Sequence, residues 1–314
     1  MTGCPSSADT SSTGKLWQKA RAWYWASRPF TLPASVVPVL VGSALAFQEG
    51  KANPGLFVLV LVASMLVQIT TNLVDEYSDH ARPEGKEKLL APYKVIARGE
   101  LSAKAVKRGA LVCFGLATAI GLYLIAVAGW PILAICAGSG VVAYLYAGGP
   151  KPLGTLGLGQ PLVFVFMGPV MVMGAYYVQA RAFTLDGLLL SVPLACTVTA
   201  ILAANDLRDL EEDRTGGKTT PVTLFGRKAG RWEWTMLVAA AFVIVAVLAL
   251  TRTPTLLALV VLLSLPEAWK AYRLVWRGQD RASLAPALRE TARLHGYLGV
   301  LLSLGVAMGR FTSF

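Results

Sequence analysis

The sequence is poor in charged residues, histidine and cysteine. Only 15% of its 314 residues are Asp, Glu, Lys or Arg, and it contains two His and four Cys. Cys113, Cys136 and Cys196 fall inside apolar runs, where packing is the expected role, and the cysteines give no disulfide framework. Neither histidine has a Cys or His partner at the spacing of a zinc site. The composition therefore argues against a disulfide scaffold and against a zinc protein.

Hydrophobic residues are abundant: they make up 55% of the chain, and the mean hydropathy is +0.56. This composition is typical of a polytopic membrane protein. Apolar runs of about 20 residues, the length needed to cross a lipid bilayer, recur along the chain. They predict about nine spans in an all-α bundle, at 31–48, 55–75, 107–128, 130–147, 160–180, 185–206, 233–251, 254–272 and 291–309.

The net charge of +11 is distributed unevenly along these spans. Nearly all of the 29 Lys and Arg lie in the N-terminal tail or on the side reached after even-numbered spans. The exceptions are Lys51, Arg181, Arg252 and Arg310. The positive-inside rule then places the N-terminus and the even-span loops in the cytoplasm, so the cytoplasmic membrane is the expected location. Topology explains the positive charge, and no nucleic-acid partner is expected.

The N-terminal region divides at about residue 15. Residues 1–14 are rich in Ser and Thr without periodicity, which predicts a disordered tail. Residues 15–314 are expected to form a single transmembrane domain. Arg28 opens the first span and has two interpretations: it snorkels to the membrane interface, or it contacts a diphosphate.

An acidic stretch, Asn205–Asp213, follows directly on the apolar run that ends at Ala204. On a continuous helix Asp206, Asp209 and Asp213 share one face, because they are spaced i, i+3 and i+7. Like charges on one face repel each other unless a cation compensates, and oxygen ligands of this kind suit Mg²⁺. The alternative for this stretch alone is a solvated acidic helix end.

Another acidic stretch, Asn72–Asp79, comes first in the chain and makes the metal interpretation stronger. Asn72, Asp75 and Asp79 repeat the same spacing, and each stretch is followed by a basic loop. Carboxylates that hold a metal, with cations nearby, form a receptor for a polyanion such as diphosphate. The two stretches end spans two and six, so an even number of crossings places both in the cytoplasm. The pattern fits a duplicated unit of four spans with a ninth added.

Two further segments break the apolar pattern. The loop after the fourth span contains Lys151 as its one cation, which favours a specific contact for this residue. Tyr144 and Tyr146 precede this loop and are either interfacial aromatics or part of a site. The fifth span contains Met167-Gly168-Pro169-Val170, and its Gly and Pro predict a kink.

At these residues the sequence resembles the UbiA superfamily of intramembrane aromatic prenyltransferases. The resemblance covers nearly the whole chain and rests on four segments: Arg28-Pro29 with Thr31–Ala34, Asn72–Asp79, Gly148-Gly149-Pro150 with Pro152-Leu153, and Asn205–Asp213. The last stretch is similar to the family motif N-D-x-x-D-x-x-x-D. The first acidic stretch departs from the commoner motif because Leu73 stands where a carboxylate is usual, and this resembles the menaquinone branch.

The resemblance implies a bundle of nine transmembrane helices around a central cavity and a Mg²⁺-dependent polyprenyl transfer. The donor is a polyprenyl diphosphate and the aromatic acceptor of the menaquinone branch is 1,4-dihydroxy-2-naphthoate. Asp75, Asp79, Asp206, Asp209 and Asp213 become the catalytic metal ligands, and Tyr144 or Tyr146 the shield of the allylic cation. The residues expected to bind the diphosphate are Asn72, Asn205, Arg28, Lys86, Lys151, Arg214 and Lys218.

Two alternatives remain for the function. One is prenylation of another acceptor, such as 4-hydroxybenzoate in the ubiquinone branch. The other is an ion-coupled transporter, because acidic residues inside a bundle often mark ion pathways. Both acidic stretches lie at helix ends on one side of the membrane, which argues against the transporter.

Overall fold

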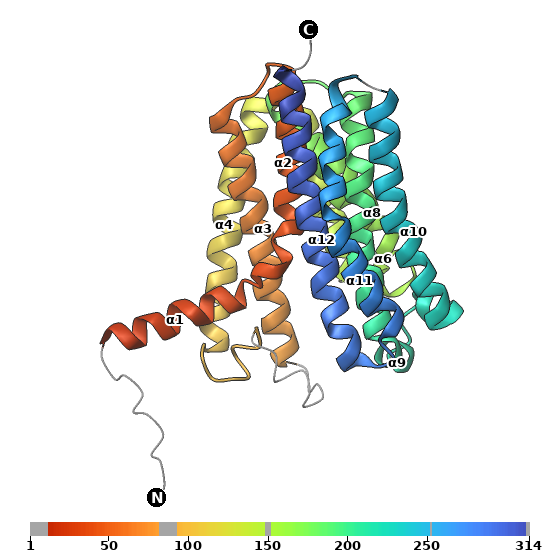
Figure 1. Cartoon of the computed structure of the whole chain (residues 1–314). Coiled ribbons are helices and arrows are strands. Elements are labelled where there is room, and N and C mark those ends of the chain that lie inside the picture. The colour runs from red at the N-terminus through yellow and green to blue at the C-terminus, as the bar shows by residue number, and fades with distance from the viewer. Residues whose placement is uncertain (1–11, 82–92, 148–151, 252, 312–314) are drawn as a thin grey trace, which may run out of the picture. The chain divides into compact units, whose positions relative to one another are not determined.

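The computed structural model describes residues 12–81, 93–147, 152–251 and 253–311 (Figure 1). These residues are helical apart from turns and an isolated β-bridge between Leu156 and Thr219. The prediction of an all-α protein is therefore confirmed. The N-terminal helix begins at Ser12, three residues before the expected domain boundary, and residues 1–11 lie outside the described part.

The α-helices are α1 (Ser12–Ala26), α2 (Pro33–Gln48), α3 (Pro54–Ala81), α4 (Ala103–Ala128), α5 (Trp130–Ala147), α6 (Gly159–Val165), α7 (Met171–Ala180), α8 (Leu185–Arg208), α9 (Leu210–Thr215), α10 (Pro221–Thr251), α11 (Leu265–Arg277) and α12 (Arg281–Met308). Short 3₁₀ or π segments join them: η1 (Pro29–Thr31), η3 (Leu153–Thr155), η4 (Phe166–Val170), η5 (Thr253–Ser264) and η6 (Gly309–Phe311).

Each of the nine predicted spans is helical, but the number of spans is not confirmed as nine. Within the described residues, six helices are long and apolar enough to cross a membrane, and a bent pair, Leu16–Thr31 with Pro33–Gln48, makes a seventh if counted as one. Helix α5 is not among the six, because its apolar part, Trp130–Tyr146, is shorter than theirs. The predicted span 254–272 is divided between η5 and α11.

The chain forms two compact units. The first comprises Met1–Leu32 with Met65–Thr118, and the second comprises Pro33–Ser64 with Ala119–Phe314. In the first unit, the described residues share a core around Leu73, Val95 and Val106, which are fully or almost fully buried. Gly109 permits a close approach there, because a Cβ atom at this position would lie 2.6 Å from the Trp23 ring.

Helix α8 is the centre of the second unit. It packs against α2, α6, α10, α12 and η4, and Figure 1 shows α10 and α12 running beside it. Its N-terminus is capped by Thr184, whose hydroxyl accepts a hydrogen bond from the Gly187 amide at 3.2 Å. Small residues such as Ala200 and Ala203 let the neighbouring helices approach closely. This packing fixes the position of the acidic stretch at the end of α8.

The predicted kink in the fifth span is a π-helical segment, η4, which contains Pro169. Proline removes one backbone N–H donor, so the hydrogen-bond pattern of the helix shifts there. Gly168 packs directly on α8: a Cβ atom at Gly168 would lie 2.4 Å from the Ala195 Cβ. The missing side chain of Gly168 therefore permits close packing of η4 on α8.

Candidate functional site

In the second acidic stretch of the chain, Asn205–Asp213, two aspartates contact one lysine. Lys218 Nζ lies 3.0 Å from Asp206 Oδ1 and 2.9 Å from Asp213 Oδ2. Asp206 is almost completely buried, with 2% of its surface exposed. Burial acts to lower the pKa of Lys218, but the two carboxylates outweigh this effect and the pKa of Lys218 is raised. The two aspartates thus converge on one cationic group.

The backbone after α9 brings Lys218 back toward the aspartates. Gly217 has a φ of 68°, a left-handed conformation that glycine adopts readily. The Lys218 amide then donates to the Asp213 carbonyl at 2.8 Å, which closes the turn at the end of α9. The sequence Gly216-Gly217-Lys218 is the local signal for this turn.

Asp209 points to different partners because the helix breaks there. Asp209 lies between α8 and α9, with φ −98° and ψ 13°. Arg208 donates to both of its carboxylate oxygens, from Nε at 2.8 Å and from Nη2 at 2.5 Å, and Arg281 of α12 lies 3.4 Å away. Asn205 Oδ1 accepts from Arg208 Nη2 at 2.8 Å. Asp209 thus contacts Arg208 and Arg281, whereas Asp206 and Asp213 meet at Lys218.

The flanking charges of this stretch are paired at the surface. Glu211 is 74% exposed and forms ion pairs with Arg214 at 3.9 Å and with Arg227 at 3.6 Å. Glu212 forms an ion pair with Arg281. Arg214, a predicted diphosphate contact, is thus engaged by a neighbouring carboxylate.

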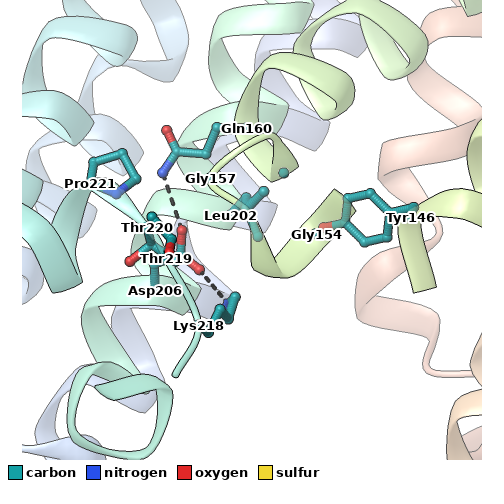
Figure 2. Close-up of a pocket in the computed structure, with 11 residues that line it drawn as sticks. Tyr146, Gly154, Gly157, Gln160, Leu202, Asp206, Lys218, Thr219, Thr220 and Pro221 are labelled. Carbon is teal, nitrogen blue, oxygen red and sulfur yellow. Dashed lines mark hydrogen bonds and ion pairs between the residues drawn. The ribbon is translucent and has the colours of Figure 1, made fainter. Parts of the chain in front are cut away.

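A pocket adjoins Asp206 and Lys218 (Figure 2). Its lining residues come from α5, η3 and the turn after it, α6, α8, and residues 218–221 at the start of α10, and they include Tyr146, Gly154, Gln160, Leu202 and Thr219. Gln160 Nε2 donates to Asp206 Oδ2 at 3.2 Å. Tyr146 therefore belongs to the site region, whereas Tyr144, the other predicted aromatic, is 69% exposed and does not line the pocket.

The first acidic stretch, in the other unit, has a different arrangement. Asn72 is buried and donates from Nδ2 to the Ser27 carbonyl at 2.8 Å and to Thr31 Oγ1 at 2.9 Å. It therefore anchors the segment before α2. Asp75 is 53% exposed and lies 3.4 Å from Arg28 Nη1.

Arg28 is held in place by its backbone and by an aromatic ring. It has a left-handed backbone with φ 49°, and its guanidinium lies over the Tyr93 ring at 4.8 Å. Its ion pair with Asp75 gives it a partner more specific than the membrane interface. Of the remaining predicted residues, Lys86, Lys151 and the Asp79 side chain lie outside the described part of the chain.

Sequence analysis did not single out several residues of these clusters. Glu76 is buried, accepts from the Ile96 amide at 3.1 Å and lies 4.0 Å from Lys94. Gln160 and Arg281 were missed in the other unit. The available signal was an isolated polar residue next to or inside an apolar run, which is uncommon in membrane helices.

The residues around Lys218 fit a divalent cation by their chemistry. Among the described residues, no group of three or more His, Cys, Asp or Glu side chains is already gathered as a metal site. However, one Asp206 oxygen and one Asp213 oxygen lie within 3.0 Å of a single cationic nitrogen. Paired carboxylate oxygens are the ligands that Mg²⁺ takes in proteins. These two side chains would hold the metal.

The model of the UbiA prenyltransferase family matches residues 35–292. The chain belongs to this family. This match confirms the resemblance inferred from the sequence motifs. It also confirms the predictions that the protein is an integral membrane protein and a prenyltransferase.

Relatives of this UbiA family member cover nearly all of its length. The 1,4-dihydroxy-2-naphthoate octaprenyltransferase of Bacillus subtilis is 31% identical over 296 residues, which is 94% of this chain and 93% of the relative. The octaprenyltransferase of the same description in Escherichia coli is 30% identical over 301 residues, covering 94% of this chain and 98% of the relative.

The fold is also similar to a solved structure. A UbiA homolog from Archaeoglobus fulgidus, solved bound to GPP and Mg²⁺, superposes with a TM-score of 0.58 at 15% identity, covering 90% of this chain and 99% of that one. At this identity the likeness shows the fold of the family.

Proposed function

We propose that this protein transfers a polyprenyl group from a polyprenyl diphosphate to 1,4-dihydroxy-2-naphthoate, a step of menaquinone-type quinone biosynthesis. The observation that carries the proposal is the convergence of Asp206 and Asp213 on one cationic position beside a pocket. The relatives named as 1,4-dihydroxy-2-naphthoate octaprenyltransferases, which match over almost the full length, support the choice of acceptor.

The proposed cofactor is Mg²⁺, held by Asp206 and Asp213, with Asp209, Asp75 and Asp79 as further proposed ligands. When bound, the metal supplies charge neutralisation to the diphosphate leaving group. Asp209 has to exchange part of its contact with Arg208 and Arg281 to serve as a ligand. The released arginines then stand beside the site as donors for phosphate oxygens.

The cations of the chain provide the rest of the diphosphate site in this proposal. Lys218 already lies between the two aspartates, and its three N–H donors suit phosphate oxygens. In the other unit, the Arg28 guanidinium is preorganised by its contact with Tyr93. Asn205, which begins the Asn205–Asp213 stretch, and Arg214, which follows it, are further proposed contacts of the diphosphate. Lys86 and Lys151 are proposed contacts as well.

The proposed reaction breaks the bond between C1 of the prenyl chain and the diphosphate oxygen, which leaves an allylic cation. A ring carbon of the acceptor forms the new carbon–carbon bond and then releases the group that it carried, a proton or the carboxylate as CO₂, which restores the aromatic ring, while diphosphate leaves. The Tyr146 ring lines the pocket next to Asp206, where its π-face would stabilise positive charge. Gly154 leaves the space for this ring, since a Cβ atom there would lie 3.1 Å from the Tyr146 ring.

The proposed orientation places the N-terminus and both acidic stretches in the cytoplasm. A cysteine-labelling scan in intact cells tests it: positions in 93–102 and 214–220 should be labelled from the cytoplasmic side, and Lys51 and Arg181 positions from the opposite side. Labelling of the two loop regions from opposite faces would contradict the orientation.

The activity itself is tested with purified protein, Mg²⁺, polyprenyl diphosphates of different length and a panel of aromatic acceptors. Mass spectrometry should detect a prenylated product of 1,4-dihydroxy-2-naphthoate. A product with 4-hydroxybenzoate alone would reject the proposed acceptor. Ion flux into proteoliposomes without any prenylated product would reject the enzyme and support a transporter.

A further inference from the structure

Helix α11 is amphipathic and carries cations on its exposed side. Its buried side packs against α10 and α12 in a core that includes Ala268 and Val275. The exposed side contains Lys270, Arg273 and Arg277, which share one face because they are spaced i, i+3 and i+7. Charges on a helix face are unfavourable in hydrocarbon and favourable among lipid headgroups.

Helix α12 continues the same charged surface, since it lies beside α11 (Figure 1). Arg289 and Arg293 are exposed and lie one turn apart on α12. Glu290 joins the two helices: its carboxylate lies 3.0 Å from Lys270 Nζ and 3.4 Å from Arg293 Nη1. We call this surface the α11–α12 basic surface, and its cations are Lys270, Arg273, Arg277, Arg289 and Arg293.

The α11–α12 basic surface has more cations than carboxylates. Glu290 is shared by two cations, and the other acidic residue of the two helices is Glu267 in the first turn of α11. Within the part of the chain that the structure describes, no ion pair is formed by Arg273, Arg277 or Arg289. The arginines of the candidate site differ, because each pairs with an acidic neighbour: Arg208, Arg214, Arg227 and Arg281.

Aromatic rings border the basic surface where it meets the apolar part of the helices. Trp269 is exposed and stacks on Tyr272, with ring centroids 5.4 Å apart. On α12 the exposed Tyr297 follows the arginines, and the next exposed side chains, such as Leu304, are aliphatic. Trp and Tyr concentrate at the level of the lipid headgroups. The order of cations, aromatic rings and aliphatic side chains therefore places the basic surface at the headgroup level of one leaflet.

We propose that the α11–α12 basic surface binds the headgroup of an anionic phospholipid, such as phosphatidylglycerol, in preference to a zwitterionic lipid. Arginine donates paired hydrogen bonds to phosphate oxygens, and basic surfaces between membrane helices bind anionic headgroups. The surface is held in place by Arg231, which donates to the Val275 carbonyl at 3.1 Å and to the Gly278 carbonyl at 2.6 Å. This binding goes beyond prenyl transfer and does not depend on it.

The experiment measures lipid binding to the full-length purified protein by native mass spectrometry, with dioleoyl phosphatidylglycerol as the probe and dioleoyl phosphatidylcholine as the reference. The triple variant Arg273→Gln, Arg277→Gln and Arg289→Gln should lower the affinity for phosphatidylglycerol at least about tenfold, because each cation at a membrane surface contributes about fivefold. Its affinity for phosphatidylcholine should not change. Glu290→Gln should have the opposite effect and strengthen phosphatidylglycerol binding about fivefold, because it removes a carboxylate that competes for the cations.

A matched control removes three exposed cations elsewhere, by Lys104→Gln and Arg108→Gln in α4 and Lys228→Gln in α10. The control has the same net charge as the triple variant and should bind phosphatidylglycerol like the wild type. An equal loss in the control would overturn the inference, as would equal wild-type affinity for the two lipids. Displacement of phosphatidylglycerol by an equal concentration of inorganic pyrophosphate would also overturn it, because the surface would then be a site for a free anion.

Thermal melting in detergent checks the fold of each variant. If the triple variant does not fold, Arg273→Gln alone should weaken phosphatidylglycerol binding about fivefold. Wild-type affinity in both Arg273→Gln and Glu290→Gln would then overturn the inference. The proposed function fails separately, when the wild type binds the lipid and forms no prenylated product.

Discussion

The two acidic stretches have the same residue spacing but very different surroundings. In Asn205–Asp213, Asp206 is buried and held by Lys218 and Gln160. In Asn72–Asp79, Asp75 is 53% exposed and lies 3.4 Å from Arg28. Periodicity places carboxylates on a helix, but the packing of that helix decides whether they are preorganised.

The difference follows from the helices that carry the two stretches. Helix α8 is enclosed by neighbours on most sides, so a carboxylate at its end loses water and needs fixed partners. Asp75 keeps contact with water, and its ion pair contributes little to stability. Asp206 is therefore held by neighbours within its own unit, whereas more than half of the Asp75 side chain is exposed.

Removal of divalent metal should have the largest effect, because it abolishes the proposed role of both stretches at once. Without a cation, the carboxylates cannot neutralise the diphosphate. Activity should vanish in excess EDTA and return with Mg²⁺, as measured by product formation. Full turnover in the chelator would contradict the metal site at both stretches.

The next largest effect tests the two stretches against each other. Asp206→Asn removes a preorganised charged ligand, and a loss of several kcal/mol of transition-state stabilisation corresponds to a rate decrease of about 10³-fold. Asp75→Asn removes a solvated carboxylate and should cost about 10-fold to 100-fold in kcat/KM. Equal losses for both variants would show that burial does not distinguish the two stretches.

A smaller effect concerns stability and pH in Mg²⁺-free buffer. The raised pKa of Lys218 means that its ion pairs stabilise the fold fully below the ordinary value of 10.5, and that this contribution is lost as the pH rises through the raised pKa. Lys218→Met should lower the free energy of unfolding by about 2 kcal/mol near neutral pH. The difference in Tm from the wild type should shrink above pH 10.5, and a constant difference would contradict the prediction.

The smallest effect is expected at Glu211. Its side chain is 74% exposed, so Glu211→Gln should change the rate less than about twofold, because a solvated charge is screened. Asp209→Asn, in the same stretch, should reduce the rate by orders of magnitude if Asp209 joins the metal ligands. A dead Glu211→Gln variant beside an active Asp209→Asn variant would reverse this assignment.

Local sequence patterns predicted the helices and the proximity of Asp206 to Asp213, because both depend on short-range periodicity. The nine apolar runs are helical, and Asp206 and Asp213, seven residues apart, meet at one lysine. The turn that returns Lys218 also had a local signal in its two glycines. The number of complete spans was less predictable, because η5 and α11 divide one run between two kinds of helix.

The contacts that the sequence did not reveal are long-range ones. Arg281 forms an ion pair with Asp209, although the two residues are 72 positions apart in the sequence. No periodic pattern predicts such a pair. Gln160 likewise contacts Asp206 from a helix 46 positions earlier in the chain. The helix break at Asp209 has neither a proline nor a glycine to announce it, so a continuous helix was the reasonable expectation.

The break at Asp209 also divides the charged groups around Lys218 between two helices of very different length. Asp206 belongs to α8, a 24-residue helix that packs against several neighbours, and these contacts fix the position of its carboxylate. Asp213 belongs to the six-residue α9, and Lys218 follows the turn at Gly217 that comes after this helix. A ligand between Asp206 and Asp213 would therefore contact one side chain from the long helix and one from the short helix, on either side of the break.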